Sequence, residues 1–319
     1  MVILDVLKTI IPTTLFFSAP LIFTALGGVF SERSGVINIG LEGLMVMGAF
    51  VGIVFNLSFE SVFGTLTPWL SIIVAMIVSA IFSVIHAIAS VSFRADQVVS
   101  GVAINFLALG IGVFLTKQWY DKGQTDMVKF PFHSKTIPVL SDIPMIGSMF
   151  FKNVYITSYI AILLAIIAWF VLYKTPFGLH LRAVGEHPMA ADTNGINVTR
   201  MRYTAVIISG ALGGLGGSVF ALTIAMNFSH ATIAGQGFMS LAAVIFGKWH
   251  PLGAMGAALF FGFAQSLSVI GKGLPLLQDV PQVFLLIAPY ILTILALAGF
   301  IGRAESPKAL GDPYIKGSR

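Results

Sequence analysis

The stretch KTPFGLHLRAVGEHPMAADTNGINVTRMR, residues 174–202, is the longest polar interruption in the second half of an otherwise strongly apolar chain. Long apolar runs flank it on both sides, at 155–173 and 203–226. Apolar runs of this length cross a membrane, and the polar segments that join them lie in water. The sequence therefore predicts a water-exposed connection between two membrane spans.

A short surface helix is expected inside this connection. His187-Pro188 and Asn194-Gly195 bracket about two helical turns, since proline favours the first helical position and glycine the position after the last. One side of the helix would carry Met189, Ala190 and Ala191, and the other Asp192, Thr193 and Asn194. Such a helix can dock its apolar side into a groove on a partner. The alternative is a loop that only caps two spans.

Composition places the chain among membrane proteins. Its 319 residues are 57% hydrophobic and 10% charged, whereas soluble proteins carry about 25% charged residues. The basic residues are spread over short loops and the termini, so they indicate membrane topology rather than a nucleic-acid surface. The absence of cysteine excludes a disulfide framework, a thiolate metal site and a lipid-modified N-terminal cysteine.

The order of apolar runs predicts the architecture. We expect an all-α, polytopic transmembrane helix bundle with about 8–10 membrane segments, some of them broken or re-entrant. The chain would form a single transmembrane domain of two pseudo-repeated halves, 1–116 and 154–301, joined by an external loop, 117–153. The tail, 302–319, is polar and is expected to be mobile and cytoplasmic. The expected segments are 9–30, 35–57, 69–93, 98–116, 155–173, 203–226, 232–247, 252–270 and 283–301.

The side of the membrane follows from the basic residues. Alternation gathers more Lys and Arg beside 174–202 than beside 117–153, which predicts that 174–202 is cytoplasmic. The N-terminus depends on 35–57: if this segment crosses fully, Met1 lies outside, and if it folds back, Met1 lies inside. We expect Met1 inside, because a glycine-rich segment that carries a carboxylate is a poor plain span.

Two interrupted segments point to a transport site. The segments 35–57 and 232–247 each follow the first long span of their half, and glycines interrupt both. Unwound backbone is tolerated at membrane depth only where it faces protein or a water-filled cavity, so paired broken segments indicate the translocation path. In contrast, Gly213, Gly214, Gly216 and Gly217 are expected to allow close helix packing.

Polar side chains in these segments are candidates for the path. A carboxylate such as Glu42 costs several kcal/mol at membrane depth unless it is paired, so it must face the protein interior. It could contact substrate, or it could bind backbone donors freed by a broken helix. Amide and hydroxyl groups offer the donors and acceptors that suit a heterocyclic base or sugar hydroxyls. The hypothesised path residues are Asn38, Glu42, Asn105, Phe228, Gln236, Phe238 and Ser240.

Signatures of catalysis and of nucleotide binding are missing from the sequence. The pairs Gly247-Lys248 and Gly271-Lys272 are not part of a GxxxxGK[ST] motif, so the chain has no P-loop. The histidines show no metal-ligand spacing, and no serine lies in a GxSxG elbow. We therefore expect no catalytic residue, no metal site and no cofactor in this chain.

Four regions resemble the ABC importer permeases of bacteria that serve branched-chain amino acids, simple sugars and nucleosides, in particular the permeases for nucleosides such as guanosine. They are FSERSGVINIGLEGLMVMGAF (30–50), ADQVVSGVAINFLALG (95–110), GLHLRAVGEHPMAADTNGIN (178–197) and GFMSLAAVIFGKWHPLGAMGAALFFG (237–262). In that family, the segment that corresponds to 174–202 contacts the ATP-hydrolysing subunit, and we call it the coupling segment. By resemblance, the contact residues are Glu186, His187, Pro188, Ala190, Ala191, Gly195 and Ile196.

The resemblance also implies partners and a mechanism. The chain would be one of two related permease subunits in the bacterial cell membrane, paired with a cytoplasmic ABC ATPase that binds ATP and Mg²⁺ and with an external substrate-binding lipoprotein. Nucleosides would cross by alternating access. The alternatives are a permease for a sugar or a branched-chain amino acid, an ion-coupled secondary transporter that uses Glu42, and a scaffold or channel subunit without coupling.

Overall fold

The computed structural model of the chain describes residues 2–138, 140–144, 146–273, 280–281, 283–285, 287, 291 and 305–316. The described residues form helices, with isolated β-bridges but no strand. The helices are α1 (Val2–Arg33), α2 (Leu41–Phe63), α3 (Thr67–Ala87), α4 (Gln97–Tyr120), α5 (Ile146–Phe150), α6 (Ile156–Lys174), α7 (Pro176–Glu186), α8 (Pro188–Thr193), α9 (Val198–Phe220), α10 (Gln236–Phe246) and α11 (Pro251–Ile270). Most of the predicted span 283–301 lies outside the described residues.

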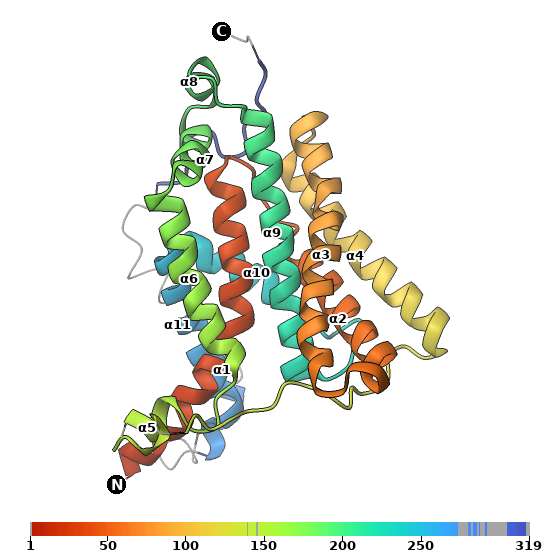
Figure 1. The fold of residues 1–319 in the computed structure, drawn as a ribbon, viewed down its shortest axis with the longest axis vertical. Helices are drawn as coiled ribbons and strands as arrows, with labels where there is room; N and C mark the ends of the chain where they lie inside the picture. The colour runs from red at the N-terminus through yellow and green to blue at the C-terminus, as the bar shows by residue number, and fades with distance from the viewer. Residues whose placement is uncertain are drawn as a thin grey trace.

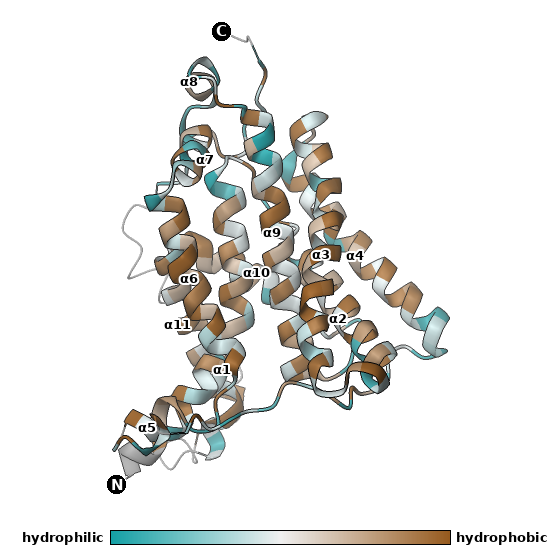
Figure 2. Cartoon of the chain, viewed as in Figure 1, coloured by the Kyte–Doolittle hydropathy of each residue, from teal (hydrophilic) through white to brown (hydrophobic). Residues whose placement is uncertain are grey.

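Membrane-spanning helices dominate the described part of the chain. Helical stretches long and apolar enough to cross a membrane are Val6–Arg33, Leu41–Ser92, Gln97–Tyr120, Ile156–Lys174, Val198–Ala225 and Pro251–Gly273. The stretch Leu41–Ser92 contains both α2 and α3, which pack against each other. Figure 2 shows hydrophobic residues along the middle of the long helices and hydrophilic residues near both ends. The predicted all-α transmembrane bundle is confirmed.

Helices α1 and α9 form the centre of the bundle (Figure 1). Small residues of α9 let its neighbours approach, as predicted for the glycines of this helix. A Cβ added at Gly217 would collide with the carbonyl of Met45 in α2, and one at Gly214 would collide with Ser79 in α3. Small residues are favoured between membrane helices because close packing replaces the missing hydrophobic driving force. The sequence of α9 thereby fixes its central position.

The predicted side of the N-terminus is wrong. The start of α1 lies at the end of the bundle that holds α5, opposite α7 and α8 (Figure 1). Helix α1 ends beside α7, where Arg33 lies 3.9 Å from Glu186. The chain then crosses back, because α2 ends near the loop that follows α4, where Glu60 pairs with Lys129. The stretch 34–63 thus crosses the bundle instead of folding back. The start of α1 and the coupling segment therefore lie at opposite ends of the bundle, not at the same end as predicted.

The expectation of a mobile tail is also wrong for 305–316. This segment lies against the end of the bundle that holds α7 and α8 (Figure 1). The N–H of Ala309 donates to the carbonyl of Gly185 at 2.9 Å, and the N–H of Gly311 donates to that of Gly35 at 3.1 Å. Sequence reasoning missed this docking because its partners are backbone groups.

Candidate functional site

The two predicted broken segments meet inside the bundle. Irregular backbone at 34–40 precedes α2, and irregular backbone at 226–235 precedes α10. The carboxylate of Glu42, the second residue of α2, accepts the N–H of Gly235 at 2.5 Å and that of Gly237 at 2.6 Å. These donors surround the first turn of α10, whose N-terminus favours a negative charge. Glu42 therefore ties the start of α2 to the start of α10.

Asn105 spans the break before α2 from the side of α4. Its Oδ1 accepts the N–H of Gly43 at 2.7 Å, and its Nδ2 donates to the carbonyl of Ile39 at 3.1 Å. Both are backbone groups at the start of α2 that have no helical partner there. Asn105 thus satisfies the donor and the acceptor that the interruption leaves open.

Three residues that sequence reasoning did not select hold the connection between α1 and α2. The Nε2 of His86 lies 3.0 Å from the carbonyl of Ile37, and its Nδ1 lies 2.9 Å from the hydroxyl of Ser100. A carbonyl only accepts, so Nε2 carries the proton and Nδ1 accepts. Gln97 accepts the N–H of Ile37 at 2.6 Å. A polar residue inside an apolar run, as His86 is, was the one available signal.

Asn38 lies in the same connection, as predicted. Its Nδ2 donates to the hydroxyl of Ser209 in α9 at 2.8 Å. Its Oδ1 is buried and has no hydrogen-bond partner among the described residues. Asn38 is therefore a residue of the predicted path that keeps a free acceptor in the interior of the bundle.

The remaining predicted path residues take different positions. Gln236 accepts the N–H of Ala234 at 2.6 Å, and Ser240 donates to the carbonyl of Gln236 at 2.9 Å, so both stabilise the first turn of α10. Phe238, also on α10, is 49% exposed. Phe228 lies apart from these, buried against Phe50 with 5.2 Å between the ring centroids. The structure brings the polar residues together around the two interruptions and leaves Phe228 in the core.

A second set of contacts joins the end of α1 to the start of α11. The indole N–H of Trp249 donates to the buried carboxylate of Glu32 at 2.5 Å. The Nε of Arg33 donates to the carbonyl of Trp249 at 2.8 Å, and its Nη2 lies 3.3 Å from the hydroxyl of Tyr173 in α6. Arg33 therefore connects three helices at the end of the bundle that carries the coupling segment.

The coupling segment folds into α7 and α8, and the predicted short helix is confirmed. Pro188 opens α8, and the backbone turns after Asn194, where Gly195 has φ +83°. Glycine adopts this left-handed conformation without strain. The N–H of Gly195 donates to the carbonyl of Asp192 at 2.9 Å, which closes the helix.

The exposure of α8 refines the expected contact surface. Ala191 is only 4% exposed and packs against Val184 and Val198, so it faces its own chain rather than water. Met189 and Ala190 are exposed. A groove of about 480 Å³ runs beside α8, lined by residues that include Leu179, His180, Ala183, Ala190, Asn194 and Ile196. Ala191 also lines this groove, but it is nearly buried, so Ala190 is the more accessible of these two predicted contact residues.

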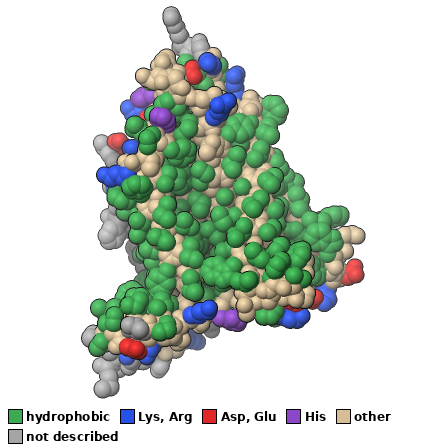
Figure 3. All heavy atoms as spheres, in the orientation of Figure 1, with side chains coloured by type: hydrophobic (Ala, Val, Ile, Leu, Met, Phe, Trp, Pro, Cys, Tyr) green, Lys and Arg blue, Asp and Glu red, His purple; other side chains and the backbone are tan. Residues whose placement is uncertain are grey.

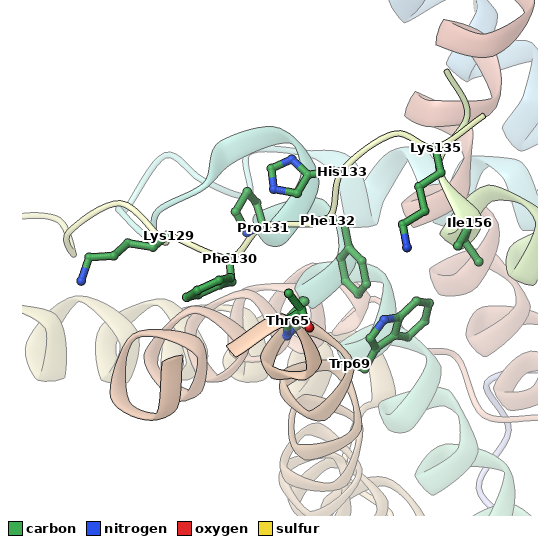
Figure 4. Close-up of a pocket in the computed structure, with 10 residues that line it drawn as sticks. Thr65, Trp69, Lys129, Phe130, Pro131, Phe132, His133, Lys135 and Ile156 are labelled. Atoms are coloured by element: carbon green, nitrogen blue, oxygen red, sulfur yellow. The ribbon is translucent and has the colours of Figure 1, made fainter. Parts of the chain in front are cut away.

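A cavity of about 320 Å³ lies at the opposite end of the bundle (Figure 4). Trp69, at the start of α3, and Phe132, in the loop after α4, meet edge to face with centroids 4.9 Å apart. Lys129 and Lys135 also line it, and an ion pair with Glu60 raises the pKa of Lys129.

In Figure 3, charged side chains gather at the two ends of the visible face, and hydrophobic side chains cover the region between them.

Comparisons with known proteins agree with this architecture. A family described as branched-chain amino acid transport system / permease component matches residues 10–297. The chain is 64% identical over 317 residues to the guanosine ABC transporter permease protein NupQ of Bacillus subtilis, with 99% of each chain covered. It is 50% identical over 314 residues to the nucleoside ABC transporter permease protein NupC of Lactococcus lactis, covering 98% of this chain and 99% of that relative.

A more distant relative is the guanosine ABC transporter permease protein NupP of Bacillus subtilis. The identity is 27% over 268 residues, which cover 82% of this chain and 74% of the relative. The family match extends over nine-tenths of the chain and includes both interrupted helices and the coupling segment. The protein thus belongs to the family of branched-chain amino acid transport system permease components.

Proposed function

We propose that the chain is the membrane-spanning permease subunit of an ATP-driven importer of nucleosides in a bacterial cytoplasmic membrane. The observation that carries the proposal is an exposed short helix, α8, beside a groove at one end of a bundle whose interrupted helices meet in its interior. Family membership supports the permease role, and the similarity to a guanosine permease (64% identical) and a nucleoside permease (50% identical) supports nucleosides as substrates.

The proposed partners follow from the two ends of the bundle. A cytoplasmic ABC ATPase, which would bind ATP and Mg²⁺, docks at α7 and α8, and an external substrate-binding lipoprotein docks at the end that holds α5. A second, related permease completes the pore. This last point is supported by two different guanosine permease proteins of Bacillus subtilis, NupQ and NupP, to which the chain is similar.

The path is proposed to run along the exposed side of α10, beside the interruption before α2. Phe238 presents an aromatic face there, and Asn38 offers a buried acceptor that has no hydrogen-bond partner among the described residues. An aromatic ring and amide groups can hold a flat heterocycle by stacking and hydrogen bonding. Glu42 and Asn105 are proposed to support this path from behind, because their side-chain oxygens already accept backbone N–H groups.

Movement is proposed to pass from α8 to the path through Arg33. Gly185, near the end of α7, packs against the backbone of Arg33 closely enough that a Cβ would collide with it. The guanidinium of Arg33 also lies 3.9 Å from Glu186 and donates to Trp249 just before α11. A displacement of α7 and α8 by the ATPase would therefore shift the end of α1 and the start of α11 together.

Reconstitution tests the proposal. The chain, purified with its partners and placed in liposomes, should take up radiolabelled guanosine when ATP and the receptor protein are supplied. Uptake of labelled glucose or leucine in place of guanosine would favour the sugar or branched-chain amino acid alternative. Uptake by the chain alone, without ATP but with an ion gradient, would instead indicate a secondary transporter.

A matched pair of arginine substitutions tests the docking site. Ala190→Arg places a long charged side chain on the exposed side of α8 and should abolish co-purification of the ATPase while the chain stays folded. The control is Gly123→Arg at the opposite end, where Gly123 is exposed and an added Cβ meets nothing within 4 Å. Equal ATPase recovery with both variants would rule out docking at α8.

A further inference from the structure

The segment 305–316 follows a defined course across the end of the bundle that carries the coupling segment. It first pairs with the end of α7, where the N–H of Ala309 donates to the carbonyl of Gly185 at 2.9 Å. The N–H of Lys308 lies 3.4 Å from the carboxylate of Glu186. Pro307 and Ala309 are buried, so this part of the segment is packed against the bundle and not merely laid over it.

The segment is next anchored between α9 and the connection that joins α1 to α2. Arg202, in the second turn of α9, is 1% exposed and donates through Nη1 to the carbonyl of Asp312 at 2.8 Å. The N–H of Gly311 donates to the carbonyl of Gly35 at 3.1 Å. Gly311 has φ +87°, a conformation that strains any residue with a Cβ. This turn therefore depends on glycine at position 311.

The far end of the segment reaches α8. Tyr314 packs onto the cluster formed by Val184, Ala191 and Val198, the same cluster that seats α8. Lys316 lies 4.0 Å from the carboxylate of Asp192 in α8. Burial and the carboxylate of Asp192 raise the pKa of the Tyr314 hydroxyl. A groove of about 270 Å³ separates this part of the segment from Pro188 and Met189.

A helix as short as α8 needs such neighbours. It has six residues, fewer than the about 12–15 at which an isolated helix becomes even marginally stable in water. Its position is therefore set by tertiary contacts, which come from α7, from α9 and from 305–316. Removing the contacts of 305–316 would leave α8 held by α7 and α9 alone.

We infer that residues 305–316 are a strap that positions the coupling helix α8 relative to the membrane-spanning bundle. The strap joins four places that must move together when α8 is pushed: the end of α7, the connection between α1 and α2, the start of α9, and α8 itself. Arg202 and Gly311 are its positioning residues. The consequence for coupling rests on the proposed function, whereas the consequence for the order of α8 does not.

The test compares the full chain with three variants: a chain that ends at residue 304, Gly311→Val, and Lys308→Ala. The last is the control, because the strap uses the backbone N–H of Lys308 and leaves its side chain exposed. The first readout is hydrogen exchange of the amides of residues 191–196 in detergent, several of which bond within α8 and the turn after it. We expect exchange to rise about tenfold in the first two variants, a factor that corresponds to about 1.4 kcal/mol, and to stay unchanged in the control.

The second readout is the amount of nucleoside transported per ATP hydrolysed by the reconstituted complex, which should fall several-fold in the same two variants. Unchanged exchange in both would overturn the strap, and raised exchange with unchanged coupling would overturn its positioning role. If the full chain itself shows no ATP-driven uptake, the proposed function fails, and the exchange measurement still decides whether the strap orders α8.

Discussion

Replacing Glu42 tests the junction of the two interrupted helices. Glu42 is 9% exposed, and its carboxylate accepts two backbone N–H groups, at 2.5 and 2.6 Å. Glu42→Ala removes both acceptors and leaves the N–H groups of Gly235 and Gly237 without partners inside the bundle. Glu42→Gln keeps one acceptor oxygen but turns an amide NH₂ toward the second donor, so it should retain about half of the interaction.

The magnitude follows from these bonds. A hydrogen bond to a charged group contributes about 1.5–3 kcal/mol, so two such bonds give about 3–6 kcal/mol for Glu42→Ala and about half of that for Glu42→Gln. The matched control is Asp126→Asn, since Asp126 is an exposed acid that pairs with Lys122 at 3.2 Å. An exposed pair of this kind contributes less than about 1 kcal/mol.

The assay is unfolding of the purified chain by SDS in mixed micelles, which gives the free energy of unfolding of each variant. The expected order of stability is wild type and Asp126→Asn, then Glu42→Gln, then Glu42→Ala. Equal stability of Glu42→Ala and Asp126→Asn would refute the reasoning. Stability that stays at the wild-type level while nucleoside affinity falls would assign Glu42 to the substrate instead.

Three further predictions concern other parts of the bundle. Asn105→Ala leaves the N–H of Gly43 unpaired and should lower the free energy of unfolding by about 1–3 kcal/mol in the same assay; an unchanged value would contradict its role at the break. Burial and the charge of Arg33 lower the pKa of His250 below its usual 6.5. Protonation below pH 6.5 therefore favours the unfolded chain, so the free energy of unfolding should fall as the pH is lowered below 6.5. His250→Gln should weaken this pH dependence, and an identical pH profile in the variant would exclude His250 as its source. Protease added to intact spheroplasts should cut within 121–155 and spare 187–197, and the reverse pattern would invert the proposed orientation.

Sequence reasoning succeeded where membrane burial leaves few choices. Apolar runs had to become helices, because lipid offers no partner for free backbone groups. Pro188 and Gly195 bracketed α8 because each residue favours one end of a helix. A carboxylate at membrane depth had to find a partner, and Glu42 found it in backbone N–H groups almost two hundred positions away. The need for a partner was visible in the sequence, but the identity of the partner was not.

Sequence reasoning failed where backbone groups decide the outcome. The strap donates backbone N–H groups to the carbonyls of Gly185 and Gly35, and its own Asp312 carbonyl accepts from Arg202. Any residue type supplies such backbone groups, so the sequence does not mark them. The side of the N-terminus was misjudged because the glycines and the carboxylate of 35–57 were interpreted as signs of a segment that folds back, whereas the irregular stretch and α2 together cross the bundle. Ala191 was assigned to the outer side of α8 because a helix of six residues gives too few positions to fix which side faces inward.

The bond between Glu42 and the first turn of α10 limits how a passage through this subunit can open. Separating α2 from α10 would strip a buried carboxylate of both donors at a cost of about 3–6 kcal/mol, with no replacement at that depth. We therefore expect α2 and α10 to move as one rigid unit. In the proposed two-subunit importer, the gate for a solute is then placed where this unit meets the neighbouring subunit, at the seam between the two subunits and not in the interior of either.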